Sequence, residues 1–391
     1  MKMSFADILR QVDSEGARKM ASKVPEWQDV EGLSFPTKLC TEQCSSSETA
    51  RYKAGVALRE YGRISGVPDA GKKPYLADLT GGLGVDSWAF SQVCEEVFYN
   101  EMDEILASGV RSNFGKLSAD NITVHSNELV PGSLETILCG FKPDIIFLDP
   151  ARRSDSGKKV FMVEDCRPDI LTLRDELLAC APLVIVKLSP MADISLLARQ
   201  LGDHVLGIHV VGSAGECKEL LVIMDRDHHE SYDITVHESE SDFHFTPEEE
   251  DASSARLCEA DRLAGKMLFE PGKALMKAGA YNLICERHGL SKLGRSTHLY
   301  VSEEIVGSLT GLGKWYRIES TDELNKRSMK ETGKSHPRCE VTARNIPMSS
   351  DELRKRMGTT SGGDKHVFGV KCDLSGSNLL MVTTRLGNIR P

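Results

Sequence analysis

Short apolar segments alternate with helical patterns between Pro74 and about Asp225. We expect strands at residues 75–79, 96–101, 122–125, 144–149, 183–188, 204–211 and 219–224. Strands that alternate with helices are typical of a parallel sheet with both faces covered. The last two are separated only by GSAGECK, which is too short for a crossover connection. The sequence therefore predicts an α/β sheet that ends in an antiparallel pair.

Other patterns flank this region. Residues 1–70 are predicted to be helical, and the capping pattern Ser45-Ser46-Ser47-Glu48 starts a helix that Gly62 can end. After an acidic hairpin and linker, residues 269–289 predict a helix and residues 296–304 a strand. The tail predicts a capped helix within ARNIPMSSDELRKRMG and strands at HVFGVKCD and NLLMVTTRL. We expect four domains, at residues 1–70, 71–262, 263–318 and 319–391.

Length and cysteine usage restrict the class of protein. The chain has 391 residues, without an apolar run of the roughly 20 residues that a membrane span needs. The N-terminus MKMSFADILRQVDSEG does not resemble a signal peptide. Its 11 cysteines are scattered singly without a Cys-x-x-Cys pair, which disfavours a zinc or iron–sulfur site. We expect a cytoplasmic protein with reduced thiols, and neither a membrane nor a metal partner.

The net charge of −10 is unevenly distributed. Residues 225–262 contain 13 acidic residues against 3 arginines, a local charge of −10. Residues 320–391 contain 13 lysines and arginines against 8 acidic residues, a local charge of +5. The acidic stretch predicts a solvated surface. The basic tail is a weak indication of nucleic-acid binding.

The most informative motif lies between the first strand and the following helix, and it reads Asp78-Leu79-Thr80-Gly81-Gly82-Leu83-Gly84-Val85-Asp86. Glycines allow the backbone to turn tightly and to approach a ligand. An acid at the strand end would repel a pyrophosphate, but it suits the cationic sulfonium and amino groups of S-adenosylmethionine. An ordinary glycine-rich turn is the alternative. We expect cofactor contacts from Asp78, Thr80, Gly82 and Gly84.

Two further strand ends carry polar residues. The second strand ends in Tyr99-Asn100-Glu101, and a carboxylate there can accept hydrogen bonds from both hydroxyls of a ribose. Asp103 is expected to cap the next helix instead. After the third strand, the amide of Asn127 could meet an adenine edge, although a plain turn explains Asn127 almost as well.

The fourth strand runs into Asp149-Pro150-Ala151-Arg152-Arg153. Open α/β sheets bind ligands at this edge, so Asp149 could orient or deprotonate an acceptor and the arginines could hold a phosphate or carboxylate. We expect catalytic roles for Asp149, Pro150 and Arg152, and a cofactor contact from Asp149. The fifth strand ends in Lys187, but a surface pair of Lys187 with Glu216 is an equal alternative, and the role of Lys218 stays open.

Six segments together resemble the bacterial THUMP-like-domain class I S-adenosylmethionine-dependent methyltransferases: QCSSSETARYKA, DLTGGLGVDS, LDPARR, VKLSPMADI, GECKELL and EPGKALMKAGAY. The resemblance implies a Rossmann-like seven-stranded sheet with a terminal antiparallel hairpin. It also implies a helical N-terminus, a ferredoxin-like module at 263–318 and a THUMP-like domain at 319–391. The implied cofactor site comprises Asp78, Gly82, Gly84 and Glu101, with the acceptor site near Asp149.

The chain departs from related enzymes after Asp149-Pro150. Methyltransferases that act on amino groups of bases resemble one another in having an aromatic residue there to stack on the base, but this chain has Ala151 and Arg152. Methylation at carbon 5 of a pyrimidine needs a cysteine nucleophile, and Cys166 and Cys217 lie outside the expected places. Direct transfer to nitrogen or oxygen remains, without a covalent enzyme intermediate.

The first hypothesis is therefore a methyltransferase that uses S-adenosylmethionine to methylate tRNA or rRNA, which the C-terminal domain would bind. Because true THUMP domains belong to RNA-modifying enzymes, this assignment of RNA rests on analogy of fold. The alternatives are a methyltransferase for a small molecule or a protein, and a non-catalytic RNA-binding protein. A nicotinamide-dependent oxidoreductase is disfavoured by Asp78 and by the terminal hairpin. The oligomeric state stays open.

Overall fold

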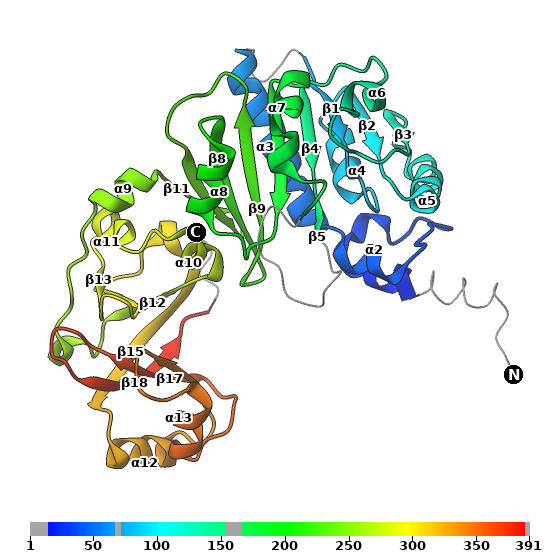
Figure 1. Cartoon of the computed structure of the whole chain (residues 1–391). Helices are drawn as coiled ribbons and strands as arrows, with labels where there is room; N and C mark the ends of the chain where they lie inside the picture. The colour runs from blue at the N-terminus through cyan, green and yellow to red at the C-terminus, as the bar shows by residue number, and fades with distance from the viewer. Residues whose placement is uncertain (1–14, 67–71, 153–165, 388–391) are drawn as a thin grey trace, which may run out of the picture. The chain divides into compact units, whose positions relative to one another are not determined.

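The computed structural model describes residues 15–66, 72–152 and 166–387, although the side chain of Arg152 is outside this description. The chain forms two compact units (Figure 1). The first contains the chain up to His209 together with Glu219–Tyr232. The second contains Val210–Lys218 and the chain from Asp233 onward. The four-domain division expected from the sequence stays a prediction.

Helical segments precede the sheet of the first unit. After a helix that includes residues 15–23, they are η1 (Pro25–Trp27), α2 (Lys38–Gln43) and α3 (Ser47–Ser65). The hydroxyl of Ser46 accepts a hydrogen bond from the backbone N–H of Thr49 at 3.3 Å and so caps α3. The predicted end at Gly62 is wrong. Because Ile64 still packs against the core, the helix continues to Gly66, where a φ of 64° ends it.

The sheet that follows contains all seven predicted strands. They are β1 (Tyr75–Asp78), β2 (Glu96–Asn100), β3 (Ile122–His125), β4 (Ile145–Leu148), β7 (Leu183–Leu188), β8 (Val205–Ser213) and β9 (Glu216–Asp225). β1 pairs in parallel with β2 and β4, β2 with β3, and β4 with β7. β9 is antiparallel to β7. Ala214 and Gly215, which join β8 to β9, have positive φ angles of 53° and 78°, as a tight hairpin turn requires.

The complete strand order is β11-β10-β8-β9-β7-β4-β1-β2-β3. The predicted sheet with its terminal hairpin is confirmed. The strand order continues into β10 (Asp233–Glu238) and β11 (Ser241–Phe245), which belong to the second unit. These two strands are antiparallel and come from the acidic stretch, where a hairpin was expected. Val236, Phe243 and Phe245 are buried there, because every second residue of β11 turns its apolar side chain inward.

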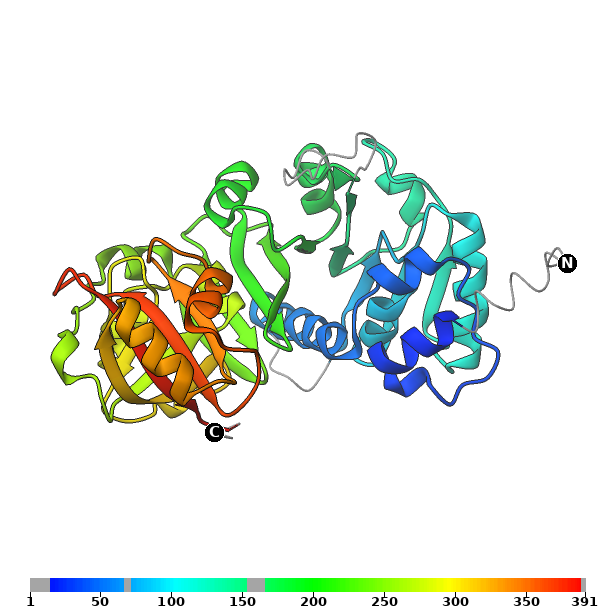
Figure 2. The same cartoon turned by 90° about the horizontal axis from the view of Figure 1, so that it is seen from below.

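Helices cover both faces of the sheet in the first unit. α3, α4 (Val85–Ser91) and α5 (Glu104–Lys116) share one apolar cluster with the strands, which includes Ala54, Phe90 and Phe147. Figures 1 and 2 show α7 (Ile170–Cys180) and α8 (Ile194–Leu201) on the opposite face. A short α6 (Leu134–Leu138) packs beside α7. Both faces are therefore protected from water, as a parallel sheet requires.

The second unit contains a seven-stranded sheet in the order β13-β14-β12-β15-β18-β17-β16. Its strands are β12 (Met267–Pro271), β13 (Ser291–Lys292), β14 (Tyr300–Ser302), β15 (Gly313–Glu323), β16 (Glu340–Arg344), β17 (Lys365–Lys371) and β18 (Asn378–Arg385). Its helices are α9 (Pro247–Ala252), η3 (Ala260–Arg262), α10 (Lys273–Ala278), α11 (Leu283–His288), η4 (Gly307–Leu309), α12 (Lys326–Ser335) and α13 (Ser350–Met357). In Figure 2 the two orange helices are α12 and α13.

Two expectations for the second unit need correction. Residues 269–289 are not one helix, because Pro271 ends β12 and Gly279, with a φ of 91°, ends α10 before α11 begins. The sequence also missed β15 and α12. The predicted strand around residue 300 and the capped helix and two strands of the tail are confirmed as β14, α13, β17 and β18.

All eleven cysteines are free thiols. Within the described residues, none of the helices is long and apolar enough to cross a membrane. The same part of the chain holds no group of three or more His, Cys, Asp or Glu side chains arranged to bind a metal ion.

Candidate active site at the carboxyl ends of the strands

Asp78 is the last residue of β1 and lies beneath the glycine-rich loop with only 1% of its surface exposed. One carboxylate oxygen accepts a hydrogen bond from the Ser87 hydroxyl at 2.5 Å, and the other accepts one from the Thr80 backbone N–H at 3.3 Å. Burial raises the pKa of Asp78 to about 7, and the nearby carboxylates of Asp86 and Asp149 add to this rise. Asp78 therefore holds the loop in shape and can ionise near neutral pH.

The three glycines of the loop serve different purposes. A Cβ atom on Gly81 would lie 2.1 Å from the ring of Tyr99, and one on Gly84 would lie 2.6 Å from the ring of Phe114. A Cβ on Gly82 would meet nothing within 4 Å, but its φ of 53° favours glycine. Gly81 and Gly84 thus permit close packing, whereas Gly82 leaves open space above the loop. The sequence did not single out Gly81.

Glu101 stands beside this open space. The backbone N–H of Gly82 donates to one oxygen of its carboxylate at 3.0 Å, and that of Asp103 donates to the other at 2.9 Å. The Tyr99 hydroxyl donates to the carbonyl of Gly82 at 2.5 Å. The side chain of Asp103 accepts from the first turn of α5, as predicted for a cap. These bonds fix the carboxylate of Glu101 next to the loop.

Asn127 reaches the same edge through a residue that the sequence missed. The side-chain amide of Asn127 donates to the side-chain oxygen of Asn100 at 3.1 Å. The amide of Asn100 in turn donates to the carbonyls of Leu79 and Asn127, at 3.2 and 3.0 Å. The buried Asn100 therefore ties the exposed Asn127 to the glycine-rich loop.

Asp149 follows β4 and is joined to the loop by Thr80. The backbone N–H of Asp149 donates to the hydroxyl of Thr80 at 2.6 Å. Pro150 is buried directly behind Asp149. Arg152 belongs to β5 (Ala151–Arg152), which pairs with β6 (Cys166–Arg167), but the side chain of Arg152 and the whole of Arg153 lie outside the described part of the chain.

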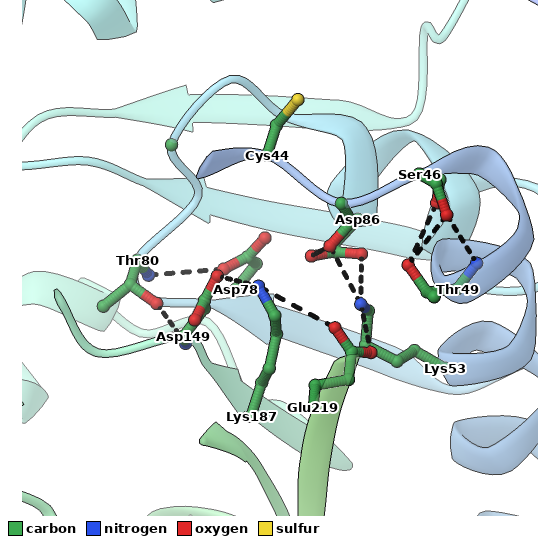
Figure 3. Close-up of polar contacts among 12 residues, drawn as sticks. Cys44, Ser46, Thr49, Lys53, Asp78, Thr80, Asp86, Asp149, Lys187 and Glu219 are labelled. Atoms are coloured by element: carbon green, nitrogen blue, oxygen red, sulfur yellow. Dashed lines mark hydrogen bonds and ion pairs between the residues drawn. The ribbon is translucent and has the colours of Figure 1, made fainter. Parts of the chain in front are cut away.

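Lys187 lies behind Asp149 in a chain of buried charges (Figure 3). Its ammonium group donates to Asp149 Oδ2 at 2.5 Å and lies 4.0 Å from Glu219 Oε2. Burial alone lowers the pKa of Lys187, but the charges of Asp149, Glu219 and Asp86 outweigh it and raise this pKa above its usual value. Lys187 is therefore held as a cation. Glu216, its alternative partner in the sequence, is exposed and pairs with Lys273 at 2.5 Å.

Lys53 of α3 extends the chain of charges from the other side and is fully buried. Its ammonium group donates to Glu219 Oε1 at 2.8 Å and to the Ser45 hydroxyl at 2.9 Å, and it lies 3.1 Å from Asp86 Oδ1. The Ser45 hydroxyl donates to the other oxygen of Asp86 at 2.8 Å. A buried lysine needs such partners, because an unpaired charge in the interior is very unfavourable.

Comparisons with known proteins identify the family of this chain. Family models match a ferredoxin-like domain at residues 267–309 and a THUMP domain-like region at residues 313–385. A protein from Porphyromonas gingivalis W83, whose solved structure is described as that of a methyltransferase, is 30% identical to this chain. The match covers 96% of this chain and 90% of that one, with a TM-score of 0.82. The chain belongs to the THUMP-like-domain class I methyltransferase family.

More distant likenesses cover less than half of the chain. They include a SAM dependent methyltransferase from Aquifex aeolicus, at 13% identity, 49% of this chain, 99% of that chain and a TM-score of 0.34. A precorrin-6y C5,15-methyltransferase from Geobacter metallireducens GS-15 matches at 13% identity, 45% of this chain, 86% of that chain and a TM-score of 0.30. The comparison with curated proteins returned no match.

The family resemblance contained a signal for the residues that sequence reasoning missed. Five of the six segments that carry the resemblance each contribute a side chain to the loop or to the charge network of this family member. These side chains are Ser45 and Lys53, Asp78 and Asp86, Asp149, Lys187, and Glu219. Segments far apart in the chain thus meet at one edge of the sheet. The charged residues in these motifs marked the segments as candidates for the site, but did not indicate which of the charges pair.

Proposed function

We propose that the chain is an S-adenosylmethionine-dependent methyltransferase that acts on RNA, such as tRNA or rRNA, by direct transfer of the methyl group. The observation that carries the proposal is the junction of three strand ends. Thr80 ties the glycine-rich loop to Asp149, and Gly82 ties the same loop to the carboxylate of Glu101. A cofactor site and an acceptor site then share one edge of the sheet, as transfer between two bound molecules requires.

The residues at this edge fit the cofactor. Its ribose has two hydroxyls that can donate hydrogen bonds to the carboxylate of Glu101, and the space above Gly82 is open to a ligand. Its sulfonium and amino groups are cationic. The charge network supplies an excess of negative charge: Lys53 and Lys187 pair with Asp86, Asp149 and Glu219. The buried Asp78 adds a further negative charge when it is ionised.

We assign the cofactor to Asp78, Thr80, Gly82, Gly84, Glu101 and Asn127, with Asp149 between cofactor and acceptor. When bound, the cofactor supplies a methyl group on a positively charged sulfur. Asp78 acts from beneath the loop, because both of its oxygens already accept hydrogen bonds there. Glu101 holds the ribose, and Asp149 orients the acceptor. Pro150 and Arg152 complete the proposed acceptor site.

The C-terminal region supports RNA as the acceptor. The THUMP domain-like match covers β15 to β18 with α12 and α13. In α12 the exposed side chains of Lys326, Lys330 and Lys334 recur every fourth residue, which aligns them on one face of the helix. Such a row can contact successive phosphates. The eleven free thiols fit the reducing environment of the cytoplasm, where we expect this activity.

The first test is a calorimetric titration with S-adenosylmethionine, with NADH as a comparison ligand. We expect micromolar binding that Glu101→Ala abolishes. The matched control is Glu95→Ala, since Glu95 is exposed next to the opposite end of β2. Absence of cofactor binding to the wild type would overturn the proposal.

The second test follows labelled methyl transfer to bulk RNA, to protein and to small molecules. We expect label in RNA, with RNA binding that weakens steeply as the salt concentration rises. Label confined to protein or small molecules would overturn RNA as the acceptor while retaining the methyltransferase. Cofactor binding without any transfer would favour a non-catalytic RNA-binding protein.

A further inference from the structure

A line of alternating charges runs from the interior of the first unit to its surface. Lys53, Glu219, Lys187 and Asp149 come from α3, β9, β7 and the turn after β4, and successive members lie 2.8, 4.0 and 2.5 Å apart. The exposed fractions of their side chains are 0%, 5%, 13% and 36% in that order. The line therefore opens to solvent at Asp149, with the ammonium group of Lys187 directly behind it (Figure 3).

The cation at this position discriminates between acceptor atoms. A nitrogen acceptor gains positive charge as it takes up a methyl group, and the ammonium group of Lys187 would repel that charge. A hydroxyl oxygen gains negative charge as its proton leaves, and the same ammonium group would attract it. Lys187 therefore disfavours methylation of an amine and favours reaction at a hydroxyl.

The turn after Asp149 supports the same choice. A base presented for methylation of its amino group needs a stacking partner, and Ala151 offers none at the position next to Pro150. A ribose hydroxyl needs no stacking at that position. It needs an acceptor for its proton, which the half-exposed carboxylate of Asp149 provides.

We propose that the acceptor is the 2′-hydroxyl of an RNA ribose, with Asp149 as the proton acceptor and Lys187 as the group that stabilises the reacting oxygen. This inference rests on the proposed function. Within an RNA chain the 3′ and 5′ oxygens are bound in phosphodiesters, so the 2′-hydroxyl is the free hydroxyl of each internal nucleotide.

In the transfer step the hydroxyl oxygen exchanges its bond to hydrogen for a bond to carbon. Its bond to hydrogen breaks, and the proton passes to the carboxylate of Asp149. The oxygen forms a new bond to the methyl carbon, while the electron pair of the broken carbon–sulfur bond stays on sulfur and cancels its positive charge. Asp149 then returns its proton to solvent. Lys187 keeps its own protons throughout, as its raised pKa requires.

Glu219 and Lys53 are positioning residues in this scheme. Glu219 faces both ammonium groups, so it restrains Lys187 from behind while Asp149 holds it in front. Lys53 fixes Glu219 in turn through the 2.8 Å bond. The N-terminal helix α3 therefore contributes to the acceptor site through Lys53.

The position of the methyl group tests the inference. Bulk RNA from cells that lack this gene is incubated with the protein and labelled S-adenosylmethionine, and is then hydrolysed in alkali. A 2′-O-methyl group blocks cleavage of the next phosphodiester, so we expect label in alkali-stable dinucleotides. Label on mononucleotide bases would overturn the ribose assignment but retain the proposed function. Absence of label from RNA would overturn both.

Variants test the roles of the two groups. Lys187→Met and Asp149→Asn are expected to lower the transfer rate by about 100-fold or more. For Lys187→Met, a residue without an assigned cofactor contact, the calorimetric affinity for S-adenosylhomocysteine should change by less than about 3-fold. Asp149→Asn preserves the shape of the side chain. It therefore keeps the inference testable if Lys187→Met fails to fold. Lys19→Met is the control, because Lys19 is an exposed lysine of the same unit that pairs with Glu42. Full activity of Asp149→Asn would overturn the assignment.

A second readout needs neither cofactor nor RNA. Nitrogen-15 NMR of labelled lysine side chains should detect a slowly exchanging ammonium signal that disappears in Lys187→Met. With Asp149, Glu219 and Asp86 facing Lys187, that signal should persist to about pH 9. Loss of the charge of Lys187 below this pH would make it a base rather than a stabilising cation and would overturn its role.

Discussion

The hydroxyl of Thr80 accepts a hydrogen bond from the backbone N–H of Asp149 at 2.6 Å. This bond joins the loop after β1 to the turn after β4, although 69 residues separate the two. A class I methyltransferase must hold cofactor and acceptor at a fixed separation. The geometry assigns part of that task to a single threonine.

Replacement of this threonine should uncouple the two sites. Thr80→Val keeps the shape of the side chain but leaves the N–H of Asp149 without its partner, which costs about 1 kcal/mol. We expect kcat for RNA methylation to fall by about 10-fold, because Asp149 is no longer held at a fixed distance from the loop. Thr80→Ser, which retains the hydroxyl, should keep most of the activity. Equal kcat values for wild type and Thr80→Val would contradict this coupling.

Asp78 should make stability depend on pH. Its pKa of about 7 in the folded protein exceeds the ordinary value of 3.8, so the folded state binds the proton more tightly than the unfolded state. The free energy of unfolding should therefore fall as the pH rises from about 4 to about 7, by at most about 4 kcal/mol, and change little above that range. Urea unfolding of wild type and Asp78→Asn is measured across this range. The difference between their free energies of unfolding should change with pH if Asp78 titrates, and should stay constant if other groups cause the pH dependence.

The same titration should govern cofactor binding. A bound cation favours the ionised form of Asp78, so the affinity for S-adenosylmethionine should rise by several-fold between about pH 6 and about pH 8. In Asp78→Asn the affinity should be lower and nearly flat with pH. Calorimetry at these pH values measures the affinity of wild type and of Asp78→Asn. If the affinities of the two proteins change with pH in parallel, Asp78 is excluded as the titrating group.

Sequence patterns predicted the elements but not the contacts between them. The seven strands of the first unit were predictable because each is a short apolar run between turn residues, as in LVIVKL of β7. The pairing of Lys53 with Glu219 spans 166 residues and was not predictable, because no local pattern reports which buried charges meet. Likewise, the steric need for Gly81 depends on the Tyr99 ring, which only the folded chain brings near.

Gly81 offers a test of this tertiary constraint. A methyl group at Gly81 would lie 2.1 Å from the Tyr99 ring, so Gly81→Ala must displace either the ring or the loop. We expect a loss of about 1–3 kcal/mol in the free energy of unfolding together with loss of cofactor binding. Gly115→Ala is the control, because Gly115 lies in α5 with nothing within 4 Å of an added Cβ. This variant should be more stable than the wild type, since alanine favours a helix more than glycine does. Retained cofactor binding in Gly81→Ala would show that the Tyr99 ring moves aside without disturbing the loop.

The buried lysine of α3 should be essential for stability as long as its partners are charged. Lys53→Met leaves Asp86 without its cation and Glu219 with only the more distant ammonium group of Lys187, which should cost about 3–5 kcal/mol in urea unfolding. Adding Glu219→Gln should restore part of this loss, because it removes one of the unpaired charges. A double-mutant cycle measures the coupling. Strictly additive effects would mean that the 2.8 Å contact contributes no net stabilisation.

Cys166 separates direct transfer from covalent catalysis. The sequence placed this cysteine outside the acceptor site, yet β6 sets its backbone opposite Arg152 in the strand that follows Asp149-Pro150. Direct transfer needs no nucleophile from the protein, so Cys166→Ser should keep the transfer rate within about 2-fold of wild type. Mass spectrometry of the protein during turnover should detect no RNA adduct. A loss of about 100-fold or more in Cys166→Ser, together with a covalent adduct in the wild type, would instead indicate attack by this thiol and a carbon acceptor.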